Sequence, residues 1–408
     1  MSTETLLERI NAYENRADPY PLYAELREHG VAQQNDGSYL VGTYHEIAAL
    51  LHDPRISSDV RHRSTPDAAR PDALPPSFIA LDDPEHDRLR RLAMRPFGPP
   101  HSPGRVDALH EDIVEIAREL TDGLRDRDRI DLVDDFAYPL PVTVICRLLG
   151  VPHEDMPELR GWTNTIIASL DHSPGEDPQE KQRAGMAARM AMGAYLGDLA
   201  DRRRANPADD MISALVHDDG PQGRLDKPEL MTTLTLLTIA GHETTVNLIT
   251  NGMLTLLRHP EALERLRREP ELMPSAVEEL LRYEPPVQML PQRTPLTDIE
   301  VGGVIIPQGA PLFLMLASGN RDPLRFEDPD HFDPARRDNR HFGFGSGVHS
   351  CFGAPLARVE TQVALAELLR RLDGPRLVED PPPYRHSPIL RGPRHLPIAT
   401  DVRAGADA

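Results

Sequence analysis

A glycine-rich segment around Cys351 carries the side chain with the most distinctive chemistry in the chain. It reads FGFGSGVHSCFG over residues 342–353 and continues directly into an amphipathic stretch over 354–372. Cys351 therefore precedes a predicted helix N-terminus, where the partial positive charge of free N–H groups favours a thiolate. A single protein thiolate in such a loop, which we expect to be buried, is what a five-coordinate haem iron requires. Glycines permit backbone conformations and close approaches that side chains block, and the loop has them at Gly345, Gly347 and Gly353.

The loop by itself leaves a plainer interpretation open, because an inert cysteine buried beside a glycine-rich turn would look the same. A structural zinc site is set aside, since His349 and Cys351 offer two ligands and such a site needs four. A phosphate cradle is a weak alternative, because no strand–GxGxxG–helix unit surrounds these glycines.

A second unusual feature is a polar break in a long apolar stretch. Residues 228–258 are predicted to form one helix of roughly 30 residues, and its middle reads AGHETT over 240–245. A buried carboxylate is rarely unpaired, so the presence of Glu243 in this apolar helix requires an explanation. One is a packing defect with threonine bonding back to the preceding turn. The other is functional: Gly241 leaves space beside a diatomic ligand, Thr244 supplies a hydroxyl, and Glu243 links that hydroxyl to solvent protons.

Two charged pairs at helical spacing are individually unremarkable. Glu279 and Arg282 lie at i, i+3 and would ordinarily form a surface pair. His86 and Arg90 lie at i, i+4 on one helix face and could clamp the propionates of a haem. Neither spacing alone indicates a function.

Together these segments resemble the cytochrome P-450 family. The pattern Phe344-x-x-Gly347-x-x-x-Cys351-x-Gly353 matches the family's haem-binding signature, which is highly specific. The resemblance implies that Cys351 is the axial ligand of the haem iron. It also implies that Phe344 packs near the cysteine and that His349 contacts a propionate.

The other segments match further family motifs in the expected order. Ala240-Gly241-x-Glu243-Thr244-Thr245 resembles the oxygen-binding motif, with Ala240 and Gly241 at the cofactor, Glu243 and Thr244 catalytic, and Thr245 structural. Glu279-x-x-Arg282, followed by Pro285-Pro286-Val287, resembles a structural motif whose implied partner is Arg336. The implied propionate contacts are His86, Arg90 and Arg293.

Composition restricts the functional class. The chain has 408 residues, with 45 Lys and Arg against 65 Asp and Glu, a formal charge of −20. That balance argues against broad nucleic-acid binding, which relies on basic residues. Two cysteines exclude a disulfide framework, and the polar N-terminus lacks a secretory or membrane-anchoring segment. We therefore expect a cytoplasmic protein without a membrane span.

The elements that must position these residues are mostly helical. Apolar periodicity predicts helices over 105–122, 142–149, 228–258 and 354–372, and short strands are expected at 33–41 and around a Gly-Gly turn within 298–315. Long loops are predicted over 58–80 and 171–181, and residues 98–103 depart from the family's shorter connection. We expect a mainly α chain with a small β portion, the cytochrome P-450 fold. The resemblance implies one domain over 1–408, with the haem between the long central helix and the cysteine loop and its helix.

The activity implied by the resemblance is that of a haem-thiolate monooxygenase. Haem b would activate O₂ with two externally supplied electrons to hydroxylate or epoxidise a small molecule. Alternatives are a peroxide-dependent peroxygenase, against which Glu243 and Thr244 argue, and a non-catalytic haem-based ligand-binding protein.

The implied partners follow from what the chain lacks. No flavin or iron–sulfur module is present, so electrons should come from a separate ferredoxin or flavodoxin with an NAD(P)H-dependent reductase. The enzyme itself is expected to be a monomer. A docking patch is expected near Arg90, Arg91, Arg95 and Arg358. The substrate should be a mid-sized hydrophobic compound, such as a polyketide, terpenoid or steroid of secondary metabolism. By family analogy its pocket is lined by Ile79, Ile167, Leu237, Val287, Leu290 and Ile389.

Overall fold

The computed structural model describes residues 4–62, 74–97, 104–169, 177–218, 220 and 223–401. Its contacts divide the chain into two compact units. Unit 1 comprises Met1–Ile56, Ile113–Leu140 and Thr244–Ala408; unit 2 comprises Ser57–Asp112 and Pro141–Glu243. A single domain over 1–408 stays a prediction.

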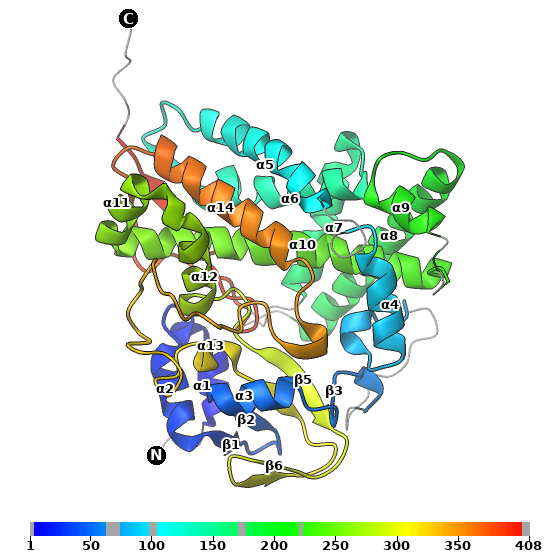
Figure 1. Ribbon diagram of the computed structural model, residues 1–408, viewed down its shortest axis with the longest axis vertical. Helices are drawn as coiled ribbons and strands as arrows, with labels where there is room; N and C mark the ends of the chain where they lie inside the picture. Colours follow the sequence, from blue (N-terminus) through cyan, green and yellow to red (C-terminus); the bar gives the residue numbers. More distant parts are fainter. Residues whose placement is uncertain are drawn as a thin grey trace, which may run out of the picture. The chain divides into compact units, whose positions relative to one another are not determined.

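Unit 1 combines a small sheet with helices. Its helices are α1 (Leu6–Asn11), α2 (Tyr20–His29), α3 (Tyr44–Leu51), α11 (Pro260–Arg268), α12 (Met273–Tyr283), α13 (Leu316–Gly319) and α14 (Ala354–Arg371). Its strands are β1 (Val31–Gln33), β2 (Tyr39–Val41), β4 (Arg129–Asp131), β5 (Leu290–Pro295), β6 (Ile299–Val301), β7 (Val304–Ile306), β8 (Leu312–Leu314), β9 (Arg376–Leu377) and β10 (Pro397–Ala399). Helix α14 packs against α12 and α11 (Figure 1).

The largest sheet has the strand order β1-β2-β8-β5-β3, where β3 is Ile56–Ser57. Strand β2 pairs antiparallel with β1 and parallel with β8. Its apolar side chains form a core with α3, in which Val41, Ile47, Leu312 and Leu314 are fully buried. This burial explains why such short strands persist, because packing rather than strand length stabilises them.

Unit 2 is helical. It contains α4 (Glu85–Met94), α7 (Met156–Ala168), α8 (Pro178–Ala205), α9 (Met211–His217) and two short 3₁₀ turns at Val60–His62 and Phe78–Ala80. Helix α7 packs extensively on α8, and α8 also contacts α9. Three further helices carry residues of both units: α5 (Arg105–Asp122), α6 (Pro139–Leu149) and α10 (Lys227–Arg258).

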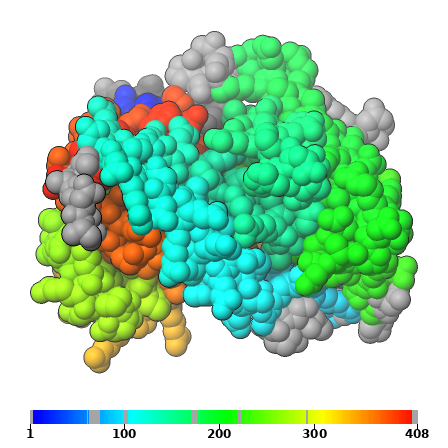
Figure 2. All heavy atoms as spheres, turned by 90° about the horizontal axis from the view of Figure 1, so that it is seen from above, coloured from blue at the N-terminus to red at the C-terminus, as the bar shows by residue number. Residues whose placement is uncertain are grey.

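The periodic segments of the sequence agree with these elements. The predicted helix 105–122 is α5, the predicted 228–258 helix is α10, and the predicted 354–372 helix is α14. The Gly-Gly turn joins β6 to β7, and both Gly302 and Gly303 have positive φ. On the face shown in Figure 2, side chains of α5 (cyan) lie beside those of α14 (orange), where Arg371 pairs with Asp122.

Some predictions fall outside what the structure describes. Residues 63–73 of the predicted 58–80 loop, most of the 171–181 loop, and 98–103 lie outside the described residues. Helix α6 begins at Pro139, three residues before the predicted start, because proline is well tolerated in a first helical turn. Among the described helices, none is long and apolar enough to cross a membrane.

Candidate active site

The loop before α14 holds Cys351 by backbone contacts. The Cys351 N–H donates to the carbonyl of Phe344 at 2.9 Å. Gly345 and Gly347 have φ of +65° and +72°, a region that favours glycine. A side chain at Gly347 would also collide with the carbonyl oxygen of Leu51. The loop conformation therefore depends on glycine at this position.

The Cys351 side chain is exposed on the protein chain and therefore open to a cofactor. Its burial, expected once haem is bound, stays a prediction. Gly353 leaves space beside the sulfur, because even an added Cβ at that position would lie 3.7 Å from Sγ, an ordinary contact distance. An accessible sulfur just before an 18-residue helix can be deprotonated and can reach a metal. These features fit the axial thiolate of a haem.

Glu278 and His341, which the sequence did not single out, form ion pairs next to this loop. Glu278 on α12 pairs with Arg358 at 2.6 Å and with His341 at 3.1 Å. The Arg358 guanidinium lies over the Phe344 ring at 4.6 Å, a cation–π contact. Burial opposes ionisation of Glu278, but hydrogen bonds from His341 and Arg358 outweigh it and lower its pKa to about 2.

An ion network with a fully buried centre links α12 to the segment that precedes this loop. Glu279 and Arg282 both have no exposed side-chain surface, and they bond at 2.7 and 2.8 Å. The Arg336 Nε atom donates to both carboxylate oxygens of Glu279 at 3.1 Å, and Asn339 donates at 3.1 Å. The structure thus brings together the three residues that the sequence resemblance connected, although 54 residues separate Arg282 from Arg336 in the chain.

The polar centre of α10 is buried. Glu243 is 1% exposed and the neighbouring Thr245 is 2% exposed, whereas Thr244 is only partly buried. The His242 ring bonds back to the carbonyl of Thr238 at 2.7 Å. A carboxyl group at this depth, next to a more accessible hydroxyl, is an arrangement that can hold and transfer a proton.

Gly241 has a packing role that the sequence did not indicate. An added Cβ would lie 2.8 Å from the Ile145 side chain of α6. Gly241 thus allows α6 and α10 to approach closely, and its assignment to ligand space stays a proposal.

Comparison with known proteins identifies the family. The family model described as cytochrome P-450 matches residues 39–395. The chain belongs to the cytochrome P-450 family. The P-450 monooxygenase PikC of Streptomyces venezuelae is 41% identical over 394 residues, which are 94% of this chain and 91% of that protein.

Solved structures agree. The bacillaene polyketide synthase P-450 PksS of Bacillus subtilis 168 has a TM-score of 0.88 at 34% identity, covering 96% of this chain and 99% of that one. A myxobacterial P-450 in complex with myristic acid has a TM-score of 0.86 at 38% identity, covering 96% and 99%. The expected fold class is therefore confirmed, and so are the monooxygenase class and the haem cofactor.

The remaining implied haem contacts of this P-450 are found on separate elements. His86 on α4 is 3% exposed, and its Nδ1 atom lies 3.1 Å from Asp83. Arg90 lies one turn further along α4, and Arg293 lies on β5. His349 ends a short 3₁₀ turn, Gly347–His349. Their roles toward the propionates stay proposals.

The predicted docking patch of the P-450 needs correction. Arg95 is mostly buried and pairs with Asp218 at 2.7 Å. Arg91 pairs with Asp87, and Arg358 pairs with Glu278. Acidic partners thus neutralise Arg91, Arg95 and Arg358, which a charge count along the sequence cannot reveal.

The predicted substrate-lining residues divide by burial. Ile167 on α7 and Leu237 on α10 are buried, whereas Ile79 is 47% exposed. Val287 and Leu290 pack against the core of the five-stranded sheet, and Ile389 packs against the α1–α2 core.

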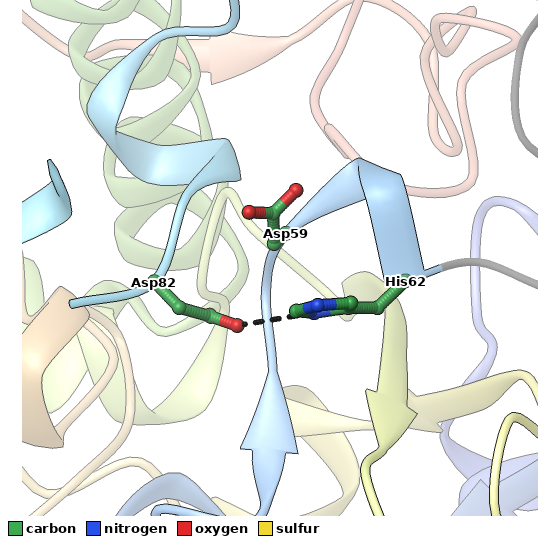
Figure 3. Close-up of side chains that lie close together, drawn as sticks. All are labelled: Asp59, His62 and Asp82. Carbon is green, nitrogen blue, oxygen red and sulfur yellow. Dashed lines mark ion pairs between the residues drawn. The ribbon is translucent and has the colours of Figure 1, made fainter. Parts of the chain in front are cut away.

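Three side chains of unit 2 meet although their sequence spacing does not suggest it. Figure 3 shows the Asp82 carboxyl group pointing toward the His62 ring, at 3.4 Å, with Asp59 close by. Ser57 donates to Asp82 at 2.5 Å. Burial raises the pKa of Asp59, but Arg61 pairs with it at 2.5 Å and brings the pKa below its usual value. Arg61 thus neutralises Asp59. The contacts of Asp82 with Ser57 and His62 join β3 to the segment before α4. Another group of one histidine and two aspartates whose side chains lie close together is formed by Asp131, Asp134 and His395.

The Glu278 network predicts a pH-dependent contribution to stability. Because the folded-state pKa of Glu278 is lowered from 4.5 to about 2, its ion pairs stabilise the fold above pH 4.5. This contribution is lost as the pH falls toward 2. Glu278→Gln should reduce the free energy of unfolding by about 1–2 kcal/mol at pH 7. Denaturant titrations of both proteins should show the difference shrinking between pH 5 and pH 3, and a constant difference would contradict the prediction.

Proposed function

We propose that this P-450 hydroxylates or epoxidises a mid-sized hydrophobic small molecule of secondary metabolism, with Cys351 as the axial ligand of the haem iron. Bound haem supplies the oxygen-binding and redox chemistry. The chain contributes the thiolate, a dry site and a proton source. Relatives named for macrolide and polyketide metabolism, such as 6-deoxyerythronolide B hydroxylase and mycinamicin IV hydroxylase/epoxidase, support this substrate class.

The observation that carries the proposal is the pair Glu243–Thr244 within α10. A carboxyl group that is 1% exposed is shielded from bulk water, and together with the adjacent hydroxyl it can relay protons. O₂ reduction consumes protons, whereas peroxide already carries reduced oxygen, so this pair favours an O₂-dependent monooxygenase. Electrons then come from a separate ferredoxin or flavodoxin and its reductase.

The proposed relay predicts uncoupling in Thr244→Ala. Haem and substrate binding should persist, but product formed per NAD(P)H consumed should fall by about tenfold or more, with hydrogen peroxide accounting for the difference. Turnover supported by added peroxide should be retained. The measurement compares NAD(P)H consumption, product and peroxide with a ferredoxin and its reductase.

Thr250→Ala is the matched control for this variant. Thr250 is a fully buried threonine of α10 whose hydroxyl bonds back to the Val246 carbonyl at 3.0 Å. Its loss removes the same atoms from the same helix without touching the proposed relay, so coupling should stay near the wild-type value. Equal coupling in Thr244→Ala and wild type would contradict the relay.

A further inference from the structure

Arg189 in the middle of α8 is an unusual cation. The buried stripe of this helix includes Gly185, Met192, Gly193 and Leu196, at spacings of three and four residues. Arg189 lies four residues from each of the two glycines, at the centre of that stripe. Arg189 is itself partly buried, and burying a guanidinium group is costly unless it is neutralised.

No carboxylate within the described part of the chain neutralises Arg189. Among those residues it has no ion pair, hydrogen bond or ring contact, in contrast to Arg203 on the same helix, which pairs with Asp210. Burial alone lowers its pKa from the ordinary arginine value, and no acidic neighbour raises it. A guanidinium stays charged at neutral pH even so, and this one has no counterion from the described chain.

The glycines on either side of Arg189 show what surrounds it. An added Cβ at Gly185 would collide with the Ser169 side chain, at the end of α7. An added Cβ at Gly193 would lie 3.5 Å from the Thr235 hydroxyl and 3.6 Å from the Met231 methyl group, both on α10. Arg189 thus lies on α8 between its approach to α7 and its approach to α10.

Thr235 provides a second, independent sign of a polar ligand. It is 4% exposed, and its hydroxyl has no hydrogen-bond partner among the residues that the structure describes. Neighbouring threonines of α10 are satisfied: Thr232 donates to the Pro75 carbonyl and Thr238 to the Leu234 carbonyl. A buried hydroxyl without a partner costs free energy, and it lies next to the helix that carries the unneutralised guanidinium.

The helices that approach α8 also carry buried apolar side chains. Ile166 and Ile167, in the last turn of α7, are buried, and so is Leu237 on α10. A ligand that satisfies both polar groups here must combine a hydrogen-bonding anion with an apolar body. A carboxylate suits the planar guanidinium especially well, because it accepts two parallel N–H bonds.

We propose that Arg189, assisted by Thr235, binds a carboxylate group of the substrate, so that this P-450 acts on an acidic amphiphile. The inference rests on the proposed monooxygenase function and specifies its substrate class. It sets this chain apart from an enzyme selective for neutral hydrophobic molecules, since such an enzyme has no use for an unneutralised arginine on that face of α8.

The test compares acids with alcohols of equal chain length. Holoenzyme is titrated with saturated C10–C16 fatty acids and the matching primary alcohols, and dissociation constants are taken from the Soret shift. Wild type should bind its preferred acid about tenfold or more tightly than the matching alcohol. Arg189→Met should remove that preference by weakening acid binding while leaving alcohol binding within about twofold. Arg189→Lys should restore part of it, and Thr235→Val should weaken acid binding about threefold.

The melting temperature measured without ligand tests whether Arg189 has a purely structural role. If Arg189 has no counterion in the chain, Arg189→Met removes an uncompensated charge and should keep or raise the melting temperature. A fall of several degrees would reveal a carboxylate partner within the chain and overturn the proposal. Equal affinity of wild type for acids and alcohols, or equal weakening of both by Arg189→Met, would also overturn it.

Two controls separate this proposal from the one on which it rests. Arg183→Met removes an exposed arginine of the same helix and should change neither affinity. The ferrous–CO spectrum is recorded on every preparation. A normal haem-thiolate band without acid preference overturns the role of Arg189 alone, whereas loss of the band in wild type overturns the proposed function.

Discussion

Replacing Cys351 by serine should abolish the ferrous–CO absorption band near ~450 nm that marks thiolate ligation. A serine hydroxyl is far less acidic than a thiol and is a poor donor to iron, so the electronic effect of the thiolate is lost. Monooxygenase activity should fall below detection. The loop itself should keep its conformation, because the bond from residue 351 to Phe344 involves only the backbone.

The second cysteine is the control for this experiment. Cys146 on α6 is 2% exposed, and burial raises the pKa of its thiol to about 12. It is therefore a neutral apolar side chain that cannot serve as a thiolate. Cys146→Ala should retain the ~450 nm band with a modest loss of stability. A band that survives in Cys351→Ser would disprove the ligand assignment.

Glu279→Ala should prevent stable haem incorporation. Glu279 is the buried carboxylate to which both Arg282 and Arg336 bond, and its removal leaves two guanidinium groups without their counterion. Breaking a buried ion pair by deleting one partner costs about 3–5 kcal/mol. The segment around Asp333, whose N–H donates to Glu279 at 3.1 Å, also loses its anchor. The expected yield of holoprotein, measured from the Soret band per mole of chain, is near zero.

The chain contains a matched pair with the same spacing. Glu264 and Arg267 on α11 also lie at i, i+3 and bond at 2.8 Å, but their side chains are 58% and 26% exposed. Glu264→Ala should leave holoprotein yield unchanged, because exposed ion pairs contribute little. If both glutamate variants lost haem to the same extent, burial of the Glu279 network would not be the cause. A normal yield from Glu279→Ala would show that the network is dispensable.

Local sequence was enough to predict α5, α10, α14 and the cysteine loop, but not the 28-residue helix α8, whose first turn lies within the predicted 171–181 loop. Apolar positions recur at helical spacing in α5 and α14, so each of these helices buries one face. Helix α10 is apolar on most of its surface and is buried around most of its circumference. The Gly302–Gly303 turn was equally predictable, because positive φ at two consecutive positions favours glycine. Strands as short as β9 have no such periodic signal, and only their pairing with β10 defines them.

The sequence by itself determined the kind of chemistry, because Cys351 with its glycines and the Glu243–Thr244 pair act through residues that are close in the chain. Only the tertiary structure decided which charges are neutralised. It paired Arg358 with Glu278 and Arg95 with Asp218, cancelling most of a basic patch that charge counting had suggested. It left Arg189 on a buried helix face without a carboxylate among the described residues. The physical reason is that charge pairing depends on the packing of distant segments, which local spacing does not encode.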